Sequence, residues 1–214
     1  MEPSPSAEPV PEGAAAHDVD VLFVLADRAI RAGLEGHGRL RVEAADLPAS
    51  LRRPRGAFVT LEVAGLLNGC IGALDPGDPL GITVPRLAWE AAFADPRLPP
   101  LTPADYDQLT VKLSLLGPLT PVPAGGEDDV VASVRPGVDG LVIAAGRHQA
   151  TFLPAVWDSL PDPYDFLRHL ELKAGLVPGQ WPPEMRVWRY PVSEHRRDIV
   201  ELRRLAATVR PSAA

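Results

Sequence analysis

Apolar residues recur at helical spacing in several segments of the chain. The series Leu22, Leu25, Ala26 and Ala29 follows Asp18 and stops at Gly33. A glycine at that point suits a left-handed C-cap, so this segment predicts an amphipathic helix.

A second helical stripe runs from Leu80 to Ala91, after Asp78 and Pro79. The aspartate and proline are typical of an N-cap and a first helical position, and Pro85 predicts a kink or the start of another helix. Three further helices are expected at a capping box beginning at Thr102, over residues 163–174 before Gly175, and after Ser193, where Ile199, Leu202 and Leu205 share one face.

Strand composition appears at residues 57–63 and 66–72, which Ala64 and Gly65 separate. A two-residue turn between them predicts a hairpin. In that register Val59 lies opposite Cys70 and Leu61 lies opposite Asn68, so all four side chains share one face of the sheet. More strands are expected at 111–115 and 185–192, with a second hairpin at 141–145 and 148–152 across Gly146-Arg147.

The domain organisation follows from composition. Residues 1–16 are rich in Pro, Ala and Glu and predict a disordered lead, which precedes one domain over 17–192 and a charged helix and tail over 193–214. A loop rich in proline and glycine after residue 118 predicts a smaller subdomain within about 118–160. A chain of 214 residues suits one domain or two small subdomains.

Charge and apolar content limit the class of protein. The net charge of −7 gives no basic footprint for phosphate backbones, so nucleic-acid binding is not expected. No apolar run reaches the length of a membrane span and the chain begins without a signal-peptide pattern, so we expect a cytoplasmic protein with no membrane domain. The single cysteine, Cys70, is compatible with that compartment.

Several ordered blocks resemble a known family. They are residues 56–61 (GAFVTL), 67–72 (LNGCIG), 91–101 (AAFADPRLPPL), 113–116 (LSLL), 136–141 (PGVDGL), 151–157 (TFLPAVW), 170–175 (LELKAG) and 188–190 (WRY). In this order they resemble the AMMECR domain family, called protein A of the AmmeMemoRadiSam system in bacteria. The resemblance implies an α+β fold: a mixed or antiparallel sheet with flanking helices, and larger and smaller subdomains sharing a cleft near the strand that carries Cys70.

The resemblance also implies partners, namely a Memo-like protein and a radical S-adenosylmethionine enzyme. This chain is neither of them, and one cysteine cannot hold an iron–sulfur cluster, so no cofactor is expected. Where the family usually carries arginine in its signature block, this chain has Asn68. The change removes a cation and its forked donors, and implies a different ligand, weaker binding or a lost activity.

Cys70 is the sharpest candidate for chemistry, because Gly69 and Gly72 allow backbone or ligand to approach closely. A nucleophile needs a neighbouring base or cation. The competing interpretation is a small buried hydrophobe, which the expected pairing with Val59 and Leu61 favours. His148, after a turn, is the candidate acid, base or ligand contact, and no histidine pair has the spacing of a metal site, so no metal is expected.

Asp95 and Arg97 follow a helix directly and predict either a charged cleft rim or a turn tied by side-chain hydrogen bonds. Arg97 gains interest because Asn68 is uncharged. Other residues of the matching blocks are candidate ligand contacts or serve strands and turns: Thr60, Asn68, Gly69, Ser114, Asp139 and Thr151.

Two functions are open at this stage. The first is an accessory or substrate-binding component that works with the Memo-like and radical enzymes on a small molecule. The alternative is a thiol-dependent enzyme that uses Cys70, with His148 or Arg97, on a small molecule.

Overall fold

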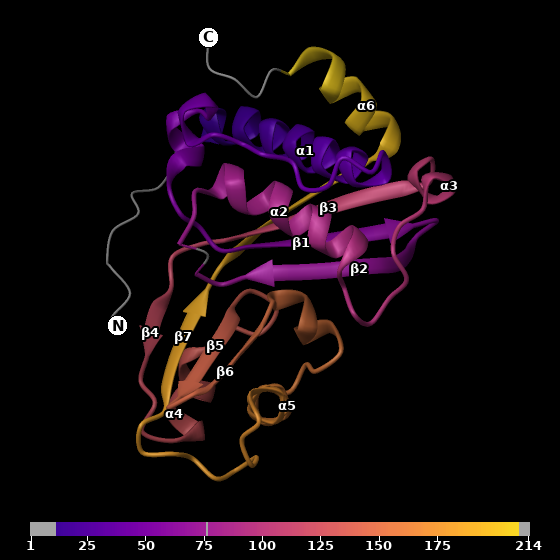
Figure 1. The fold of residues 1–214 in the computed structure, drawn as a ribbon. Coiled ribbons are helices and arrows are strands. Elements are labelled where there is room, and N and C mark those ends of the chain that lie inside the picture. The colour runs from indigo at the N-terminus through magenta and orange to yellow at the C-terminus, as the bar shows by residue number, and fades with distance from the viewer. Residues whose placement is uncertain (1–11, 76, 210–214) are drawn as a thin grey trace. The chain divides into compact units, whose positions relative to one another are not determined.

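The computed structural model describes residues 12–75 and 77–209, which form two compact units (Figure 1). The first unit holds the described residues up to Leu115 and those from Glu194 onward, and the second unit spans Leu116–Ser193. Each carries its own antiparallel sheet, its own helices and its own apolar core. The predicted α+β fold is confirmed.

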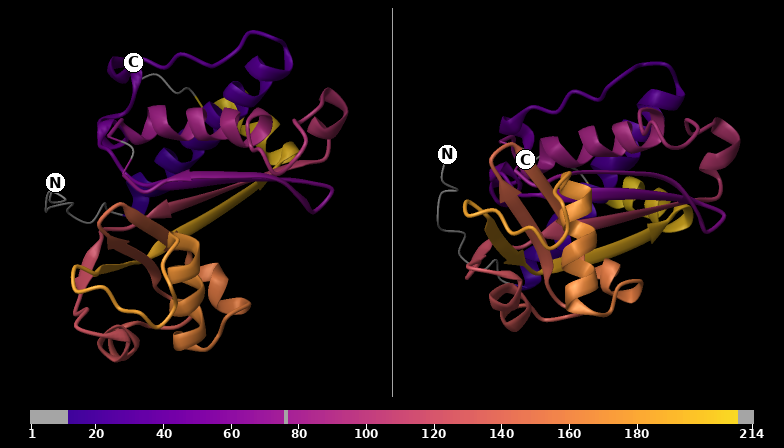
Figure 2. Two further views of the ribbon diagram at one scale, coloured as in Figure 1. Left: turned by 60° about the horizontal axis from the view of Figure 1, so that its bottom comes forward. Right: turned by 90° about the horizontal axis from the view of Figure 1, so that it is seen from below.

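The first unit is built on a four-stranded sheet in the order β2-β1-β3-β8. Its strands are β1 (Ala57–Val63), β2 (Leu66–Ala73), β3 (Leu109–Leu116) and β8 (Val192–Asp198). Its helices are α1 (Glu12–Leu34), α2 (Leu80–Phe93), α3 (Pro103–Tyr106) and α6 (Ile199–Thr208), with 3-10 turns at Ala44–Asp46 and Ala49–Arg52. Helices α1 and α2 lie on the same side of this sheet (Figure 2).

The core of the first unit lies between the sheet and these helices. Val59 and Leu61 of β1 are fully buried in it, together with Val84 and Leu87 of α2. Ile199 and Leu202 belong to the same core, so α6 packs into the core of the first unit. At about 25 cal/mol per Å² of apolar surface, each such side chain contributes roughly 2 kcal/mol relative to exposure.

The helices differ from expectation mainly at their starts. Helix α1 begins at Glu12, so residues 12–16 of the expected disordered lead are helical, and the rest of that lead lies outside the described residues. Helix α2 is capped by Pro79 instead of Asp78 and runs through Pro85 without ending there.

The predicted register of the first hairpin is wrong. Val63 pairs with Leu66 and Glu62 with Leu67, as a two-residue turn requires, but Leu61 then pairs with Gly69. Asn68 is therefore the extra residue of a β-bulge, and every later pair shifts by one position. Cys70 lies opposite Thr60 instead of Val59.

The second unit has the strand order β4-β7-β5-β6. Its elements are β4 (Thr120–Val122), α4 (Glu127–Ser133), β5 (Gly140–Ala145), β6 (His148–Phe152), a 3-10 turn (Pro154–Asp158), α5 (Pro163–Ala174) and β7 (Arg186–Tyr190). The hairpin at 141–145 and 148–152 and the helix at 163–174 are confirmed. The unit extends past the expected limit near residue 160 because β7 pairs with both β4 and β5.

Phe166 of α5 is the centre of the second core. Its ring stacks on Trp157 with a centroid distance of 3.7 Å and meets Phe152 edge-on at 5.3 Å. These aromatic contacts fix α5 against the sheet.

A buried carboxylate joins α1 to α3, and it gives a testable result. Asp27 is 1% exposed and accepts a 2.5 Å hydrogen bond from the Tyr106 hydroxyl. Burial raises the pKa of Asp27, and the Tyr106 hydrogen bond opposes that rise. Tyr106→Phe should cost about 1–3 kcal/mol at pH 7, because it leaves the buried carboxylate short of a donor.

The cost should shrink as pH falls, because protonation removes the charge that burial disfavours. Urea unfolding of Tyr106→Phe at pH 7 and pH 5 measures this. Asp27→Asn is the matched control, since it keeps an acceptor for the hydroxyl and removes the charge. In the Asp27→Asn background the cost of Tyr106→Phe should be the same at both pH values. The same cost at both pH values in wild type as well would contradict the assignment.

Candidate functional site

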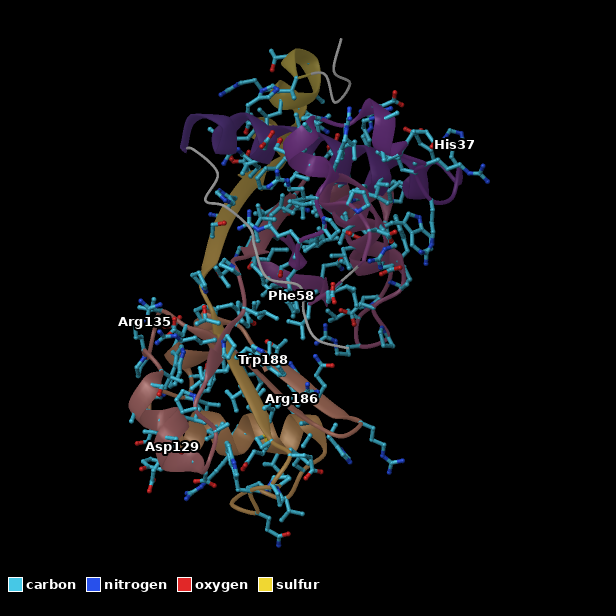
Figure 3. All side chains as sticks on the ribbon, turned by 90° about the vertical axis from the view of Figure 1, so that its left-hand side faces the viewer. His37, Phe58, Asp129, Arg135, Arg186 and Trp188 are labelled. Atoms are coloured by element: carbon cyan, nitrogen blue, oxygen red, sulfur yellow. The ribbon has the colours of Figure 1, made fainter. Side chains whose placement is uncertain are left out.

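The outer face of the first unit's sheet carries polar side chains in register. Thr60 of β1 lies beside Cys70 of β2 on one side and Lys112 of β3 on the other. The next row holds Phe58, labelled in Figure 3, beside Gly72 and Ser114. Because side chains alternate along a strand, this face is opposite to the one that buries Val59 and Leu61. We call these six residues the polar face: Phe58, Thr60, Cys70, Gly72, Lys112 and Ser114.

Cys70 belongs to the polar face and is half-buried. The Thr60 hydroxyl donates a hydrogen bond to its sulfur, with an Oγ1–Sγ distance of 3.3 Å. The expected pairing of Cys70 with Val59 and Leu61 on the core face does not form. The bulge at Asn68 thus turns the thiol from the core face to the polar face.

Asp95 and Arg97 hold the backbone of Cys70 from the loop after α2. The Asp95 side chain is 2% exposed and accepts from the Cys70 amide at 2.9 Å. It also accepts from the Arg97 amide at 3.1 Å, from Nε at 2.9 Å and from Nη2 at 2.6 Å. Arg97 Nη2 in turn donates to the Cys70 carbonyl at 2.8 Å. We call this set the Asp95–Arg97 clamp.

The clamp is strongly ionised. The hydrogen bond from Arg97 holds the pKa of Asp95 far below its usual range, against the opposing effect of burial. The hydrogen bond to Asp95 raises the pKa of Arg97, and burial opposes that rise. The guanidinium is therefore fixed beside the backbone of Cys70.

Arg97 keeps donor capacity for a ligand. Its side chain is 61% exposed, and the clamp uses Nε and Nη2. Nη1 is not part of the clamp, so it can donate to a carbonyl or carboxylate placed beside Cys70. Lys112 adds little free charge to this face, because its ammonium pairs with Glu62.

Gly69 and Asn68, the two residues before Cys70 in the signature block, have different surroundings. A Cβ added at Gly69 would lie 1.9 Å from the Ala91 carbonyl oxygen, so this glycine lets β2 approach α2 closely. Asn68 is the bulge residue, and its Oδ1 is buried without a hydrogen-bond partner in the part of the chain that the structure describes.

His148 and Thr151 lie in the second unit. The His148 ring shares a 2.9 Å hydrogen bond with the Ala174 carbonyl at the end of α5. The Thr151 hydroxyl donates to the Leu141 carbonyl at 2.8 Å and shares a 2.5 Å hydrogen bond with the Tyr190 hydroxyl. Both side chains thus make hydrogen bonds within their own unit. That either of them shares a site with Cys70 stays a prediction.

Asp139 is buried and serves a turn. It accepts from the Arg135 backbone at 2.9 Å and pairs with the Arg135 guanidinium at 2.6 Å.

Among residues 12–75 and 77–209, no three His, Cys, Asp or Glu side chains are grouped to hold a metal ion. No helix in those ranges combines the length and apolar character needed to cross a bilayer.

Comparison with known proteins decides the family. The model of the AMMECR1 family matches residues 23–195, which include the polar face and every strand except the end of β8. The chain belongs to the AMMECR1 family. The expected resemblance is confirmed for the fold and the family.

Relatives of this AMMECR1 protein support the assignment over most of the chain. A protein of Methanothermobacter thermautotrophicus is 39% identical and covers 79% of this chain and 88% of its own length. A protein of Thermofilum pendens is 35% identical and covers 75% and 80%. The crystal structure of an uncharacterized protein, PH0010, from Pyrococcus horikoshii matches with a TM-score of 0.74 and 30% identity over 83% of this chain and 90% of that one. These relatives are archaeal, so they do not support the bacterial setting that the resemblance suggested.

Proposed function

We propose that this AMMECR1 protein binds a small molecule on the polar face, beside Cys70. The observation that carries the proposal is the Asp95–Arg97 clamp, which fixes the backbone of Cys70 and leaves part of the Arg97 guanidinium exposed. A ligand with a carboxylate or carbonyl can accept from Arg97 while it lies against the thiol. Family association supports a role as an accessory or substrate-binding component of a Memo-like and radical S-adenosylmethionine modification system.

Two alkylating reagents of the same size test the ligand chemistry. Iodoacetate carries a carboxylate and iodoacetamide is neutral, and the single cysteine makes every adduct report on Cys70. Arg97→Gln should slow iodoacetate by roughly threefold more than iodoacetamide, the effect of one exposed charge pair. Arg97→Lys is the control, because it keeps the charge and should keep the preference. Equal slowing of both reagents by Arg97→Gln would contradict an anion-binding role of Arg97.

A thiol-dependent enzyme is the second candidate. The contacts that favour it are the Thr60 hydroxyl on the sulfur and the nearby Arg97 cation. Co-purification with the Memo-like protein, together with a measurement of pathway activity, separates the two functions. An accessory protein carrying Cys70→Ser should still co-purify with the Memo-like protein and support the pathway, whereas an enzyme carrying it should retain the partner and lose turnover. Recovery of no partner by the wild-type protein would count against the accessory role.

A further inference from the structure

The second unit buries a carboxyl group on the inner face of α5. Glu171 is 0% exposed and follows the buried Leu167 and Leu170. Its Oε2 accepts from the Gly179 amide at 3.1 Å, and its Oε1 is buried without a hydrogen-bond partner among the described residues. One backbone amide is too few donors to replace the water around a carboxylate. Burial therefore favours the protonated form, in which Oε1 carries the hydrogen.

A second carboxylate adds to this preference. The Glu127 side chain on α4 is 16% exposed, and a Cβ added at Gly179 would lie 3.7 Å from its Oε1, so both carboxyl groups lie beside Gly179. The Arg168 guanidinium is 3.7 Å from Glu127 Oε2, which is longer than a hydrogen bond. Burial raises the pKa of Glu171 most, and the Gly179 amide opposes that rise. The charge of Glu127 raises this pKa further, and Arg168 lowers it.

Glu171 also fastens the loop that joins α5 to β7, residues 175–185, which we call the α5–β7 loop (Figure 1). Gly179 lies in the middle of this loop with a positive φ of 75°, and its amide donates to Glu171. Two positions later, Trp181 Nε1 donates to the Ala124 carbonyl at 2.7 Å, and the Trp181 ring packs against the second core. The loop is thus held at two neighbouring points, and one of them is a group that can titrate.

We propose that Glu171 is a pH-sensitive latch on the α5–β7 loop: its neutral form keeps the loop closed, and loss of its proton to solvent releases the loop. Once ionised, Glu171 needs more donors than the Gly179 amide, and water can supply them only when the loop moves away. Repulsion from Glu127 acts in the same direction. The latch lies in the second unit and does not depend on the function proposed for the polar face.

The direction of the pH effect follows from the raised pKa. The closed form binds the proton of Glu171 more tightly than an open form, in which the carboxyl group has the ordinary pKa of about 4.3. The closed form is therefore fully favoured below that value, and the contribution of Glu171 is lost as pH rises through the pKa of the closed form.

The experiment follows the whole protein by NMR from about pH 4 to pH 8.5. The side-chain carboxyl carbon of Glu171 reports its ionisation, and the indole N–H of Trp181 reports the position of the loop. The indole N–H of Trp157 is the internal control, because it donates to the Asp139 carbonyl at 2.8 Å in the same unit and does not contact the latch.

Three variants separate the latch from a general effect of charge. Glu171→Gln keeps an acceptor for the Gly179 amide and cannot ionise. Glu127→Gln removes the neighbouring charge that raises the pKa of Glu171. Glu43→Gln, at an exposed position in the first unit, is the matched change of charge.

In the wild-type protein, the Glu171 carbon and the Trp181 indole should change together, with one midpoint above pH 4.3, while Trp157 stays constant. Glu171→Gln should abolish the response of Trp181, and Glu127→Gln should move its midpoint to lower pH. Glu43→Gln should leave the midpoint unchanged. The proposal is overturned if Trp181 does not respond in wild type, if it responds equally in Glu171→Gln, or if Trp157 changes with it.

Discussion

Gly69→Ala should destabilise the first unit by roughly 3 kcal/mol, because overpacking a closed contact costs about that much. The added methyl would lie 1.9 Å from the Ala91 carbonyl oxygen and 2.7 Å from the carbonyl carbon. These are backbone atoms of α2, so no side-chain rotation relieves the clash. The strand and the helix must separate, which also disturbs the clamp on the neighbouring Cys70.

Gly65→Ala is the matched control for Gly69→Ala. Gly65 has a positive φ of 81° in the hairpin turn, and an added Cβ there would meet no heavy atom within 4 Å. Its cost should be limited to backbone strain of about 1–2 kcal/mol. Urea unfolding followed by circular dichroism compares the two, and equal losses of stability would contradict close packing of β2 on α2.

Asp95→Asn should cost roughly 2–3 kcal/mol at pH 7, the range for hydrogen bonds to a buried charged group. The carboxylate accepts from the Cys70 amide and from three nitrogens of Arg97, and an amide group cannot accept at both of its ends. Water screens the ion pair itself, since the Arg97 side chain is exposed. The loss should therefore come mainly from the missing acceptor at Cys70.

The effect of Asp95→Asn should depend on pH in a defined direction. The pKa of Asp95 is lowered in the folded protein, so its contribution is fully present above the unfolded value of about 3.9 and is lost as pH falls through the folded value. The difference between wild type and variant should thus be constant from pH 5 to 8 and shrink below pH 4. Asp105→Asn, in the exposed capping box of α3, is the control and should change stability less. A difference that grows on acidification would contradict the clamp.

Local patterns predicted the secondary structure better than they predicted which strands pair and in which register. The strand over 57–63, the second hairpin and the helix that ends before Gly175 follow from alternation, turn residues and capping signals. Strand β8 was not expected, because its charged sequence (VSEHRRD) resembles a solvated tail, and its place in the sheet depends on tertiary pairing.

The sequence names Thr60, Cys70, Asp95 and Arg97 as candidates but not the contacts among them, and their role in a functional site stays a prediction. The order of Asp95 and Arg97 after a helix suggested a hydrogen-bonded turn, but their hold on Cys70 depends on where α2 ends in space. The orientation of Cys70 depends on the bulge at Asn68, which no turn residue in the sequence signals.

The most direct test of the account is alkylation of the native protein with iodoacetamide, followed by mass spectrometry of the intact chain. If Cys70 lies on the polar face beside Thr60 and Arg97, the folded protein should be labelled to completion at a rate near that of a half-exposed thiol, and Thr60→Val should leave it reactive. Labelling that begins only when denaturant unfolds the first unit would place the thiol in the core and contradict the assignment of the site.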